Sequence, residues 1–526
     1  MKSLPLRCSF LLLTSLTLSA QTPVPSATAV LRADQPGPVI NRNLYGQFTE
    51  HLGHCIYDGI WVGPDSPIPN TRGIRNDVVA ALRAIRVPVV RWPGGCFAEE
   101  YHWRDGIGPR GKRPAMINTN WGGVVENNHF GTHEFMDFCE QVGCEPYICG
   151  NLGSGTVQEL SNWIEYMTSD ANSPLANERR ANGRAQPWRV KYFAFGNESW
   201  GCGGNMRPEY YADVYRRFSA FAKDYPGNKL YRVAGGPNAD DYRWTEVVMK
   251  NIHAMYSATD PGMDAIALHY YTIPAGHWVD AGKGSATDFG EDQWFNSLRG
   301  ALRMDELIAK HTAIMDRADP RKKVALVVDE WGIWTDPVPG TNPGFLLQQN
   351  SLRDALIAAL NFHLFQKHAD RVSMANIAQM VNVLQSMILT DGPKMLLTPT
   401  YHVFEMFKVH QDATALPVEL ISPDYKFAGA SIPAVSASAS RDTAGKIHLS
   451  LVNTNPREPV ALSCKLAGLA ARSVTGRILT APAINSINTF DAPHSVEPAP
   501  FTGATLAAGT LNVTLPAKSI VVLELD

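Results

Sequence analysis

Two glutamates stand where a pair of carboxylates could do acid–base and nucleophilic chemistry. Glu198 follows the run KYFAFGN, Glu330 follows VALVVD, and each has a tryptophan within two residues. Hydrolysis of a glycosidic bond needs two such groups in one cleft, because one protonates the leaving oxygen while the other, ionised, attacks or activates water. The alternative is a structural ion pair for each, for example with Arg91. From the residues alone, retention and inversion both stay open.

The two glutamates occur within a regular alternation of apolar strands and helical segments. Strands are predicted at 44–49, 87–90, 146–149, 191–195, 231–234, 265–268, 324–328 and 374–378. Apolar residues have helical spacing at 76–85, 134–139, 157–167, 209–221, 244–255, 297–315 and 352–365. Eight such units over ~350 residues predict a (β/α)8 barrel, with an open doubly wound sheet as the alternative. Glu198 and Glu330 follow the fourth and seventh strands, whose C-terminal ends face one mouth of the barrel, where such barrels build their active sites.

The pattern changes near Val409, where helical periodicity stops. Short β-rich runs follow, separated by Ser, Thr, Ala, Pro and Gly. We therefore predict a catalytic barrel over 44–409 and an antiparallel, jelly-roll-like β-sandwich over 410–526. Residues 21–43 are predicted to form a linker and a strand that joins the sandwich.

Residues 1–20 have the pattern of a secretory signal peptide. Lys2 and Arg7 precede a short apolar stretch, and Ser19 and Ala20 are small residues suited to cleavage. We therefore expect export to a periplasm or out of the cell. No later segment has ~18 uninterrupted apolar residues, so no membrane span is expected. The net charge of −3, without a basic tract, gives no reason to expect nucleic acid as a partner.

The cysteines and histidines do not form a metal-binding pattern. The chain has 8 Cys, and removal of Cys8 with the signal would leave an odd number, so at least one thiol should stay free or pair between chains. The spacing of Cys139, Cys144 and Cys149 is not that of an iron–sulfur site, and neither paired CxxC nor HExxH occurs. No metal and no other cofactor are expected.

Six motifs, taken in order, resemble a known family. They are YGQFTEHLG, RWPGGCF, FGNESWGCGG, LHYYT, VDEWGIW and AQMVNVLQ. Together they resemble glycoside hydrolase family 51, the α-L-arabinofuranosidases, from about Tyr45 to the C-terminal sandwich. The resemblance implies a retaining mechanism and an exo-acting pocket for a terminal, non-reducing α-L-arabinofuranosyl unit of arabinoxylan, arabinan or their oligosaccharides. It also implies a homo-oligomer, often a hexamer.

The resemblance implies a role for each matched position. Glu198 would be the general acid/base, Glu330 the nucleophile, and Arg91 the residue that orients the nucleophile. The other matched positions are expected to contact the sugar: Glu50 and Gln379 at hydroxyl groups, Asn197 near the 2-OH, Cys96 as a free thiol in the pocket, Tyr271 beside the nucleophile with Tyr270 as the competing choice, and Trp121 and Trp334 by stacking. Several have an ordinary structural explanation as the alternative: an ion pair for Glu50 and Arg91, and core packing for Cys96, Trp121 and Trp334.

Some residues depart from the family pattern. Gly332 stands where the family often has Asn, and the stretch 337–343 after the nucleophile strand is rich in Pro and Gly. Both leave the preference for the leaving group open. The alternatives on the same fold are an endo-β-1,4-glucanase, a β-xylosidase, and a non-catalytic carbohydrate-binding protein. The last would be expected to have lost Glu198, Glu330 or Arg91, and all three are present.

Overall fold

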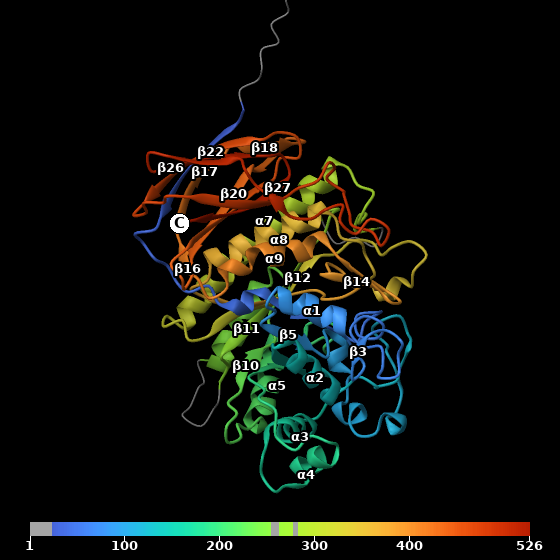
Figure 1. Ribbon diagram of the computed structural model, residues 1–526. Helices are drawn as coiled ribbons and strands as arrows, with labels where there is room; N and C mark the ends of the chain where they lie inside the picture. Colours follow the sequence, from blue (N-terminus) through green and yellow to red (C-terminus); the bar gives the residue numbers. More distant parts are fainter. Residues whose placement is uncertain (1–23, 254–261, 277–281) are drawn as a thin grey trace, which may run out of the picture.

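The computed structural model describes residues 24–253, 262–276 and 282–526 (Figure 1). The stretch predicted to be a signal peptide lies outside these residues. In Figure 1 the strands of residues beyond about 410, in orange and red, form a layer above a barrel of blue, green and yellow elements.

Eight parallel strands close into a barrel. In chain order they are β2 (Gly46–Phe48), β5 (Val89–Trp92), β8 (Glu145–Gly150), β9 (Tyr192–Phe195), β10 (Tyr231–Ala234), β11 (Ala265–Thr272), β12 (Ala325–Ile333) and β13 (Val372–Ile377). Each pairs with its neighbour in the chain, and β13 pairs with β2 to complete the circle. The predicted (β/α)8 barrel is therefore confirmed, and closure of the sheet excludes the open doubly wound alternative.

Helices surround the barrel. They are α1 (Asn76–Ala84), α2 (Thr132–Val142), α3 (Val157–Thr168), α4 (Pro174–Ala181), α5 (Pro208–Phe221), α6 (Tyr242–Val248), α7 (Glu291–Ala318), α8 (Leu352–Lys367) and α9 (Pro399–Phe407). A π-helical segment, Met249–His253, continues α6, and the end of the helix predicted at 244–255 lies outside the described residues. The periodicity did not predict α4 and α9.

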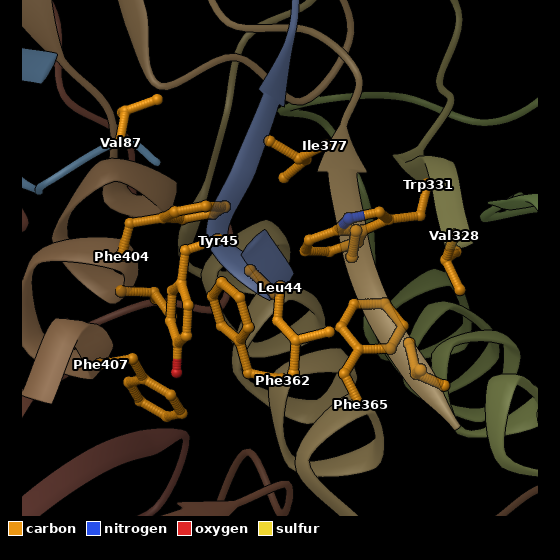
Figure 2. Close-up of a cluster of buried hydrophobic side chains, with 14 of the residues drawn as sticks. Leu44, Tyr45, Val87, Val328, Trp331, Phe362, Phe365, Ile377, Phe404 and Phe407 are labelled. Carbon is orange, nitrogen blue, oxygen red and sulfur yellow. The ribbon is translucent and has the colours of Figure 1, made fainter. Parts of the chain in front are cut away.

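Helix α8 is buried along almost its whole length, because the barrel lies on one side of it and the sandwich on the other. Its aromatic residues form part of a cluster with the 3-10 turn η1 (Arg42–Tyr45) that leads into β2, with strand β12 and with helix α9 (Figure 2). Within that cluster the Tyr45 ring stacks on Phe362 with centroids 4.5 Å apart, and Trp331 contacts Phe365 edge to face at 5.3 Å. This apolar packing anchors the strand that carries Glu330.

The second layer is a two-sheet sandwich. One sheet has the order β17-β1-β22-β26-β25 and the other β16-β20-β21-β27-β23-β24. The bounds are β1 (Ser26–Arg32), β16 (Thr414–Leu416), β17 (Val418–Ile421), β20 (Val435–Arg441), β21 (Ile447–Asn453), β22 (Val460–Ala467), β23 (Val474–Leu479), β24 (Ala499–Pro500), β25 (Ala504–Ala507), β26 (Thr510–Leu515) and β27 (Ser519–Leu525). All pairs are antiparallel except that of β1 with β22. The first described strand therefore lies inside the C-terminal layer, as the blue strand in Figure 1 shows.

Four short two-stranded antiparallel sheets, called ribbons below, occur in the described chain outside the barrel and the sandwich sheets. They are β3 (Asn70–Thr71) with β4 (Ile74–Arg75), β6 (Met116–Ile117) with β7 (Val125–Glu126), β14 (Ile388–Asp391) with β15 (Lys394–Leu397), and β18 (Asp424–Phe427) with β19 (Ala430–Pro433). The β6–β7 ribbon carries Trp121 in its connecting loop. Among the residues that the structure describes, no helix combines the length and apolar composition needed to cross a membrane.

Candidate active site

The two glutamates meet at the C-terminal mouth of the barrel. Glu198 lies three residues beyond the end of β9, whereas Glu330 lies within β12. One carboxylate oxygen of each, together with a ring nitrogen of His269, falls in a group whose atoms are all within 4.8 Å of one another. Both side chains are largely buried, with 19% of Glu198 and 7% of Glu330 exposed. Burial, followed by the negative charge of Glu330, raises the pKa of Glu198 against the opposing effects of His269 and Arg91.

Strand β12 contains an irregularity at the site. Between Val328 and Trp331 it advances by one residue more than β13, and the same extra residue appears in its pairing with β11. Such a bulge re-aims side chains that strict alternation would send to opposite faces. As a result Asp329 and Glu330, adjacent in sequence, both contact the same cluster.

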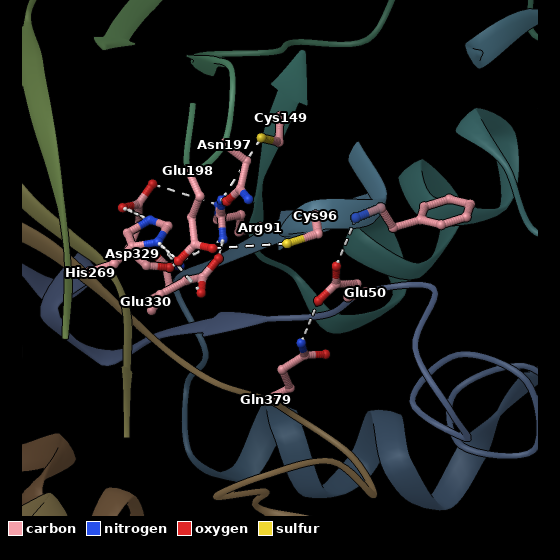
Figure 3. Close-up of polar contacts among 12 residues, drawn as sticks. Glu50, Arg91, Cys96, Cys149, Asn197, Glu198, His269, Asp329, Glu330 and Gln379 are labelled. Atoms are coloured by element: carbon pink, nitrogen blue, oxygen red, sulfur yellow. Dashed lines mark hydrogen bonds and ion pairs between the residues drawn. The ribbon is translucent and has the colours of Figure 1, made fainter. Parts of the chain in front are cut away.

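His269, from β11, links three carboxylates. Its Nδ1 lies 3.0 Å from Glu198 Oε1 and 3.5 Å from Glu330 Oε2, and its Nε2 lies 3.1 Å from Asp329 Oδ1. Burial alone would lower the pKa of His269, but the charge of Glu330 and the bonds to Asp329 and Glu198 raise it to about 10. His269 is therefore positively charged at neutral pH, and its ring lies beside both catalytic candidates (Figure 3).

Arg91 joins the nucleophile candidate to the acid/base loop. Its Nη1 donates to Glu330 Oε1 at 2.8 Å and its Nη2 donates to Asn197 Oδ1 at 2.5 Å. Burial would lower the pKa of Arg91, but the charges around it, Asp329 first, hold it well above its usual value. On the other side, Tyr271 Oη donates to Glu330 Oε2 at 2.8 Å. The competing Tyr270 points away and donates to the Gly300 carbonyl at 2.8 Å.

Glu50 forms the centre of a second polar group in the same mouth. It is 1% exposed and lies just after β2. Its Oε1 accepts from the indole Nε1 of Trp121 (2.9 Å) and the backbone N–H of Phe97 (3.1 Å), and its Oε2 accepts from Gln379 Nε2 (2.7 Å). Burial and then the charge of Glu330 raise the pKa of Glu50 to about 7, although these three donors lower it. In Figure 3, Glu50 and Gln379 lie to one side of the catalytic candidates, with Cys96 between the two groups.

The expectation of a free thiol at Cys96 is wrong. Cys96 forms a disulfide with Cys202, from the loop that follows Glu198. The sequence left the partner unassigned, and 106 residues separate the two positions in the chain. Their Sγ atoms lie 3.9 and 3.7 Å from Glu198 Oε2, so the site has a disulfide, not a thiol, beside the acid/base candidate. Five other cysteines of the described chain are free: Cys55, Cys139, Cys144, Cys149 and Cys464.

A cavity of about 1170 Å³ connects these groups. Glu198, Glu330 and Glu50 line it, together with Trp121 and Gln379. Trp334 also lines it and contacts the ring of Tyr271 edge to face, with centroids 5.1 Å apart. The cavity extends past Trp200 and along α7 to the β18–β19 ribbon of the sandwich. There is therefore room for a leaving group beyond one sugar unit.

Two sets of side chains within this mouth bring metal-ligand atoms close together. They are Cys96, Glu198 and Cys202, and Glu198, His269 and Glu330. In the first set the two sulfur atoms are bonded to each other. In the second set both ring nitrogens of His269 already face carboxylates, Nδ1 that of Glu198 and Nε2 that of Asp329.

Sequence reasoning missed several residues of this mouth. His269 and Asp329 were read only as parts of motifs, and the covalent partner Cys202 was not identified. Asp329 directly precedes Glu330, so alternation along a regular strand gave no reason to place it in the site. The available signal for His269 was its position at the end of a predicted barrel strand, which is the position that identified both glutamates.

Comparison with known proteins gives a consistent result. Residues 81–275 match the sequence family described as "Alpha-L-arabinofuranosidase 1 domain", and residues 329–519 match "Alpha-L-arabinofuranosidase C-terminal domain". A curated relative from Bacteroides ovatus, "Intracellular exo-alpha-L-arabinofuranosidase", is 52% identical over 100% of both chains. The crystal structure of the family 51 arabinofuranosidase from Xanthomonas axonopodis pv. citri superposes with a TM-score of 0.93 at 57% identity, covering 95% of this chain and 100% of that one. The arabinose complex from Thermotoga maritima gives a TM-score of 0.82 at 30% identity, with 95% and 99% covered.

The expectation of export is corrected by the first of these relatives. It rested on two basic residues and a short apolar stretch within 1–20, whereas the Bacteroides ovatus protein, similar over its full length, is described as intracellular. Such a stretch is a compositional pattern in a few residues, and a likeness over two whole chains outweighs it. The assignments of a signal peptide and of secretion are therefore withdrawn.

The sequence motifs, the closed barrel with its sandwich, and the matches over the whole chain agree with one another. The identity to the Bacteroides ovatus enzyme and the superposition on the Xanthomonas structure each cover nearly all of the described protein. The chain belongs to the α-L-arabinofuranosidases of glycoside hydrolase family 51.

Proposed function

We propose that this enzyme releases terminal, non-reducing α-L-arabinofuranosyl residues with net retention, using Glu330 as nucleophile and Glu198 as general acid/base. The observation that carries the proposal is the close approach of the two carboxylates, with one oxygen of each within 4.8 Å. Retaining pairs are ~5–5.5 Å apart, whereas inverting pairs are ~6.5–9.5 Å apart to leave room for a water molecule.

The surroundings of the two carboxylates support the division of roles. Glu330 receives hydrogen bonds from Arg91 Nη1 and Tyr271 Oη, and these two donors orient the carboxylate that attacks the anomeric carbon. Burial and the negative charge of Glu330 raise the pKa of Glu198, which suits the residue that gives the departing oxygen its proton.

The second step uses the same pair with the roles changed. Once Glu330 is esterified by the sugar it no longer carries the charge that raises the pKa of Glu198. That pKa falls, and Glu198, now ionised, takes a proton from the water that hydrolyses the ester. His269, positively charged and 3.0 Å from Glu198, stabilises the ionised form during this step.

The second polar group is suited to holding the sugar. Glu50 offers carboxylate oxygens to a sugar hydroxyl, and Trp121 and Gln379 keep that carboxylate in place. Asn197, whose Oδ1 accepts a hydrogen bond from Arg91, stays the residue proposed for the 2-OH, and Trp334 offers an apolar ring at the cavity wall. Cys96 contributes the disulfide, not a thiol, to the same wall.

For the substrate we propose arabinose-containing hemicellulose or pectin, or oligosaccharides from them. The Bacteroides ovatus relative is described as exo-acting, which supports removal of single terminal units. An exo enzyme releases arabinose from arabinoxylan or arabinan and produces no internal oligosaccharide fragments, and chromatography of the products tests this directly. For assembly we keep a homo-oligomer as a proposal, which light scattering of the purified chain tests.

The roles are tested with 4-nitrophenyl α-L-arabinofuranoside, using wild type, Glu330→Ala and Glu198→Ala. Glu330→Ala should abolish turnover, and Glu198→Ala should slow it by about 10²–10⁴-fold. Azide separates the roles. It should intercept the glycosyl-enzyme of Glu198→Ala to give the α-azide, and it should attack the substrate directly in Glu330→Ala to give the β-azide. The exposed sandwich residue Glu497, as Glu497→Ala, is the matched control. Normal turnover by Glu330→Ala, or exchanged azide products, would contradict the assignment.

A further inference from the structure

A buried carboxylate that makes no proposed sugar contact lies behind the acid/base loop. Glu99 ends the 3-10 turn η2 (Cys96–Glu99) and is 4% exposed. Its Oε2 accepts hydrogen bonds from the backbone N–H groups of Leu152 (2.7 Å) and Gly153 (2.6 Å), just after β8. Its Oε1 accepts from the backbone N–H of Asn197, just after β9. One side chain therefore ties the ends of two neighbouring barrel strands together.

The loops are built to approach this carboxylate closely. A Cβ added to Gly203 would lie 2.0 Å from the Asn197 carbonyl oxygen and 3.0 Å from Glu99 Oε1. A Cβ added to Gly196 would lie 3.0 Å from the same oxygen, and Gly196 has a φ of +86°. Because neither position has space for a side chain, the backbone wraps the carboxylate directly.

The backbone held by Glu99 continues into the acid/base residue itself. Glu198 has a φ of +41°, a left-handed conformation that non-glycine residues rarely adopt. Its carbonyl accepts from the N–H groups of Gly201 (2.7 Å) and Gly203 (3.1 Å), which closes the loop into a tight turn. Such a conformation persists only where the surrounding structure holds the backbone in place. The hydrogen bond from the Asn197 N–H to Glu99 holds the backbone one residue before Glu198.

We propose that Glu99 is a positioning residue for proton donation. By fixing Asn197 it sets the backbone from which the Glu198 carboxyl reaches the leaving oxygen. This inference rests on the proposed role of Glu198 as acid/base. The same turn is tied to the same loop a second time, since Cys96 at its other end is bonded to Cys202.

The hydrogen bonds around Glu99 require a carboxylate. Both oxygens of Glu99 accept main-chain hydrogen bonds, and an amide has only one acceptor oxygen. In Glu99→Gln the amide oxygen can still accept from the N–H groups of Leu152 and Gly153. Its NH2 group then faces the N–H of Asn197, and because both are donors the third hydrogen bond is lost. Burial raises the pKa of Glu99 to about 7 despite these bonds, and perturbed carboxyl groups of this kind gather at functional sites.

The test compares two leaving groups. Help from a general acid matters for a basic alcohol, such as methanol or a sugar, and little for 2,4-dinitrophenol. We expect Glu99→Gln to lower kcat/KM for methyl α-L-arabinofuranoside by about 10- to 100-fold and to change that for the 2,4-dinitrophenyl glycoside by less than about 3-fold. A residue that merely supports the fold would lower both values equally.

The matched control is Glu134→Gln. Glu134 is also a buried carboxylate, 6% exposed, and accepts from the Gly131 N–H and from Arg113, away from the site. It should show no dependence on the leaving group. Glu99→Asp, which keeps both oxygens but draws them back by one methylene, should show the same dependence to a smaller degree, and it serves as the test if Glu99→Gln does not fold.

Glu198→Ala separates the two proposals. The first case is that the activity of Glu198→Ala depends strongly on the leaving group. If both Glu99 variants then lose activity equally on the two substrates, or lose none, Glu99 is not a positioning residue. If Glu198→Ala shows no such dependence, the assignment of the acid/base fails first, and with it the basis of this inference.

Discussion

Replacement of Glu50 by glutamine should make the enzyme less active and, above neutral pH, more stable. The buried Glu50 carboxyl has its pKa raised from 4.5 to about 7. In the unfolded chain the group loses its proton above its ordinary pKa, whereas in the folded protein it keeps the proton up to about pH 7. The folded state is therefore penalised as pH rises from 4.5 to 7, and the full penalty applies above pH 7.

The size of the effect follows from that shift. One pKa unit corresponds to about 1.4 kcal/mol, so the ionised Glu50 costs the folded protein about 3 kcal/mol at pH 8. An amide does not ionise, and it can keep the hydrogen bonds. Its oxygen accepts from Phe97 and Trp121. Gln379 now donates its NH2 to Glu50, and once that amide turns over, the new NH2 can donate to the side-chain oxygen of Gln379, a buried atom without a partner among the described residues. Glu50→Gln should thus recover most of the cost.

Calorimetry at pH 5 and pH 8 measures the outcome. For a unit of several hundred residues, about 3 kcal/mol corresponds to a rise in Tm of about 3–4 °C. We expect this rise relative to wild type at pH 8 and only a small part of it at pH 5. The same variant should lose about 10- to 100-fold in kcat/KM, because the sugar hydroxyl loses a charged acceptor.

Glu126→Gln is a control in which the change in stability should have the opposite sign. Burial would raise the pKa of Glu126, but His51 and the other donors around it lower it. Its carboxylate therefore stabilises the fold above the ordinary pKa, and this contribution is lost at acid pH, so Glu126→Gln should cost more stability at pH 8 than at low pH. A Glu50→Gln difference in Tm that is the same at pH 5 and pH 8 would refute the reasoning.

Two further outcomes are expected from the same cluster. The pKa of His269 is raised to about 10, so its positive charge contributes stability that is complete below pH 6.5 and is lost as pH rises through 10. The difference in Tm between wild type and His269→Gln should therefore shrink between pH 6.5 and pH 10. A constant difference would contradict this. Tyr271→Phe removes the 2.8 Å hydrogen bond to Glu330 and should lower kcat/KM by about 10-fold in steady-state assays. Tyr270→Phe removes only the hydrogen bond to the Gly300 carbonyl and should leave kcat/KM unchanged.

The barrel could be predicted because its signals are local. Each barrel strand is a short apolar run that ends in a polar residue, and this pattern is sufficient to locate Glu198 and Glu330. Two helices were missed because they lack a clear apolar stripe or lie outside the βα repeat. Both nevertheless begin with a capping residue followed by proline, Ser173-Pro174 and Thr398-Pro399, and this start signal is more informative here than periodicity.

The parts of the site that sequence could not give depend on long-range geometry. The bulge in β12 brings Asp329 to the same cluster as Glu330, and alternation along a strand predicts the reverse. The partner of Cys96 is 106 residues away and was one of several possible cysteines. Glu99 reads in the sequence as one of two adjacent glutamates, and only the closed barrel brings it to the backbone of Asn197.

The position of β1 has a consequence for how the chain is made. Ser26 pairs with Ala461 across the parallel β1–β22 contact, so an early strand finds this neighbour only when almost the whole chain exists. At ~5–20 residues per second the ribosome needs roughly 20–90 s to synthesise the roughly 430 residues between them. The other neighbour of β1, β17, is also made late, at Val418–Ile421, so for most of that interval β1 has no sheet partner and is able to pair with another nascent chain. Slow synthesis should therefore favour aggregation of this protein, and a circular permutant that moves β1 to the C-terminus should relieve it.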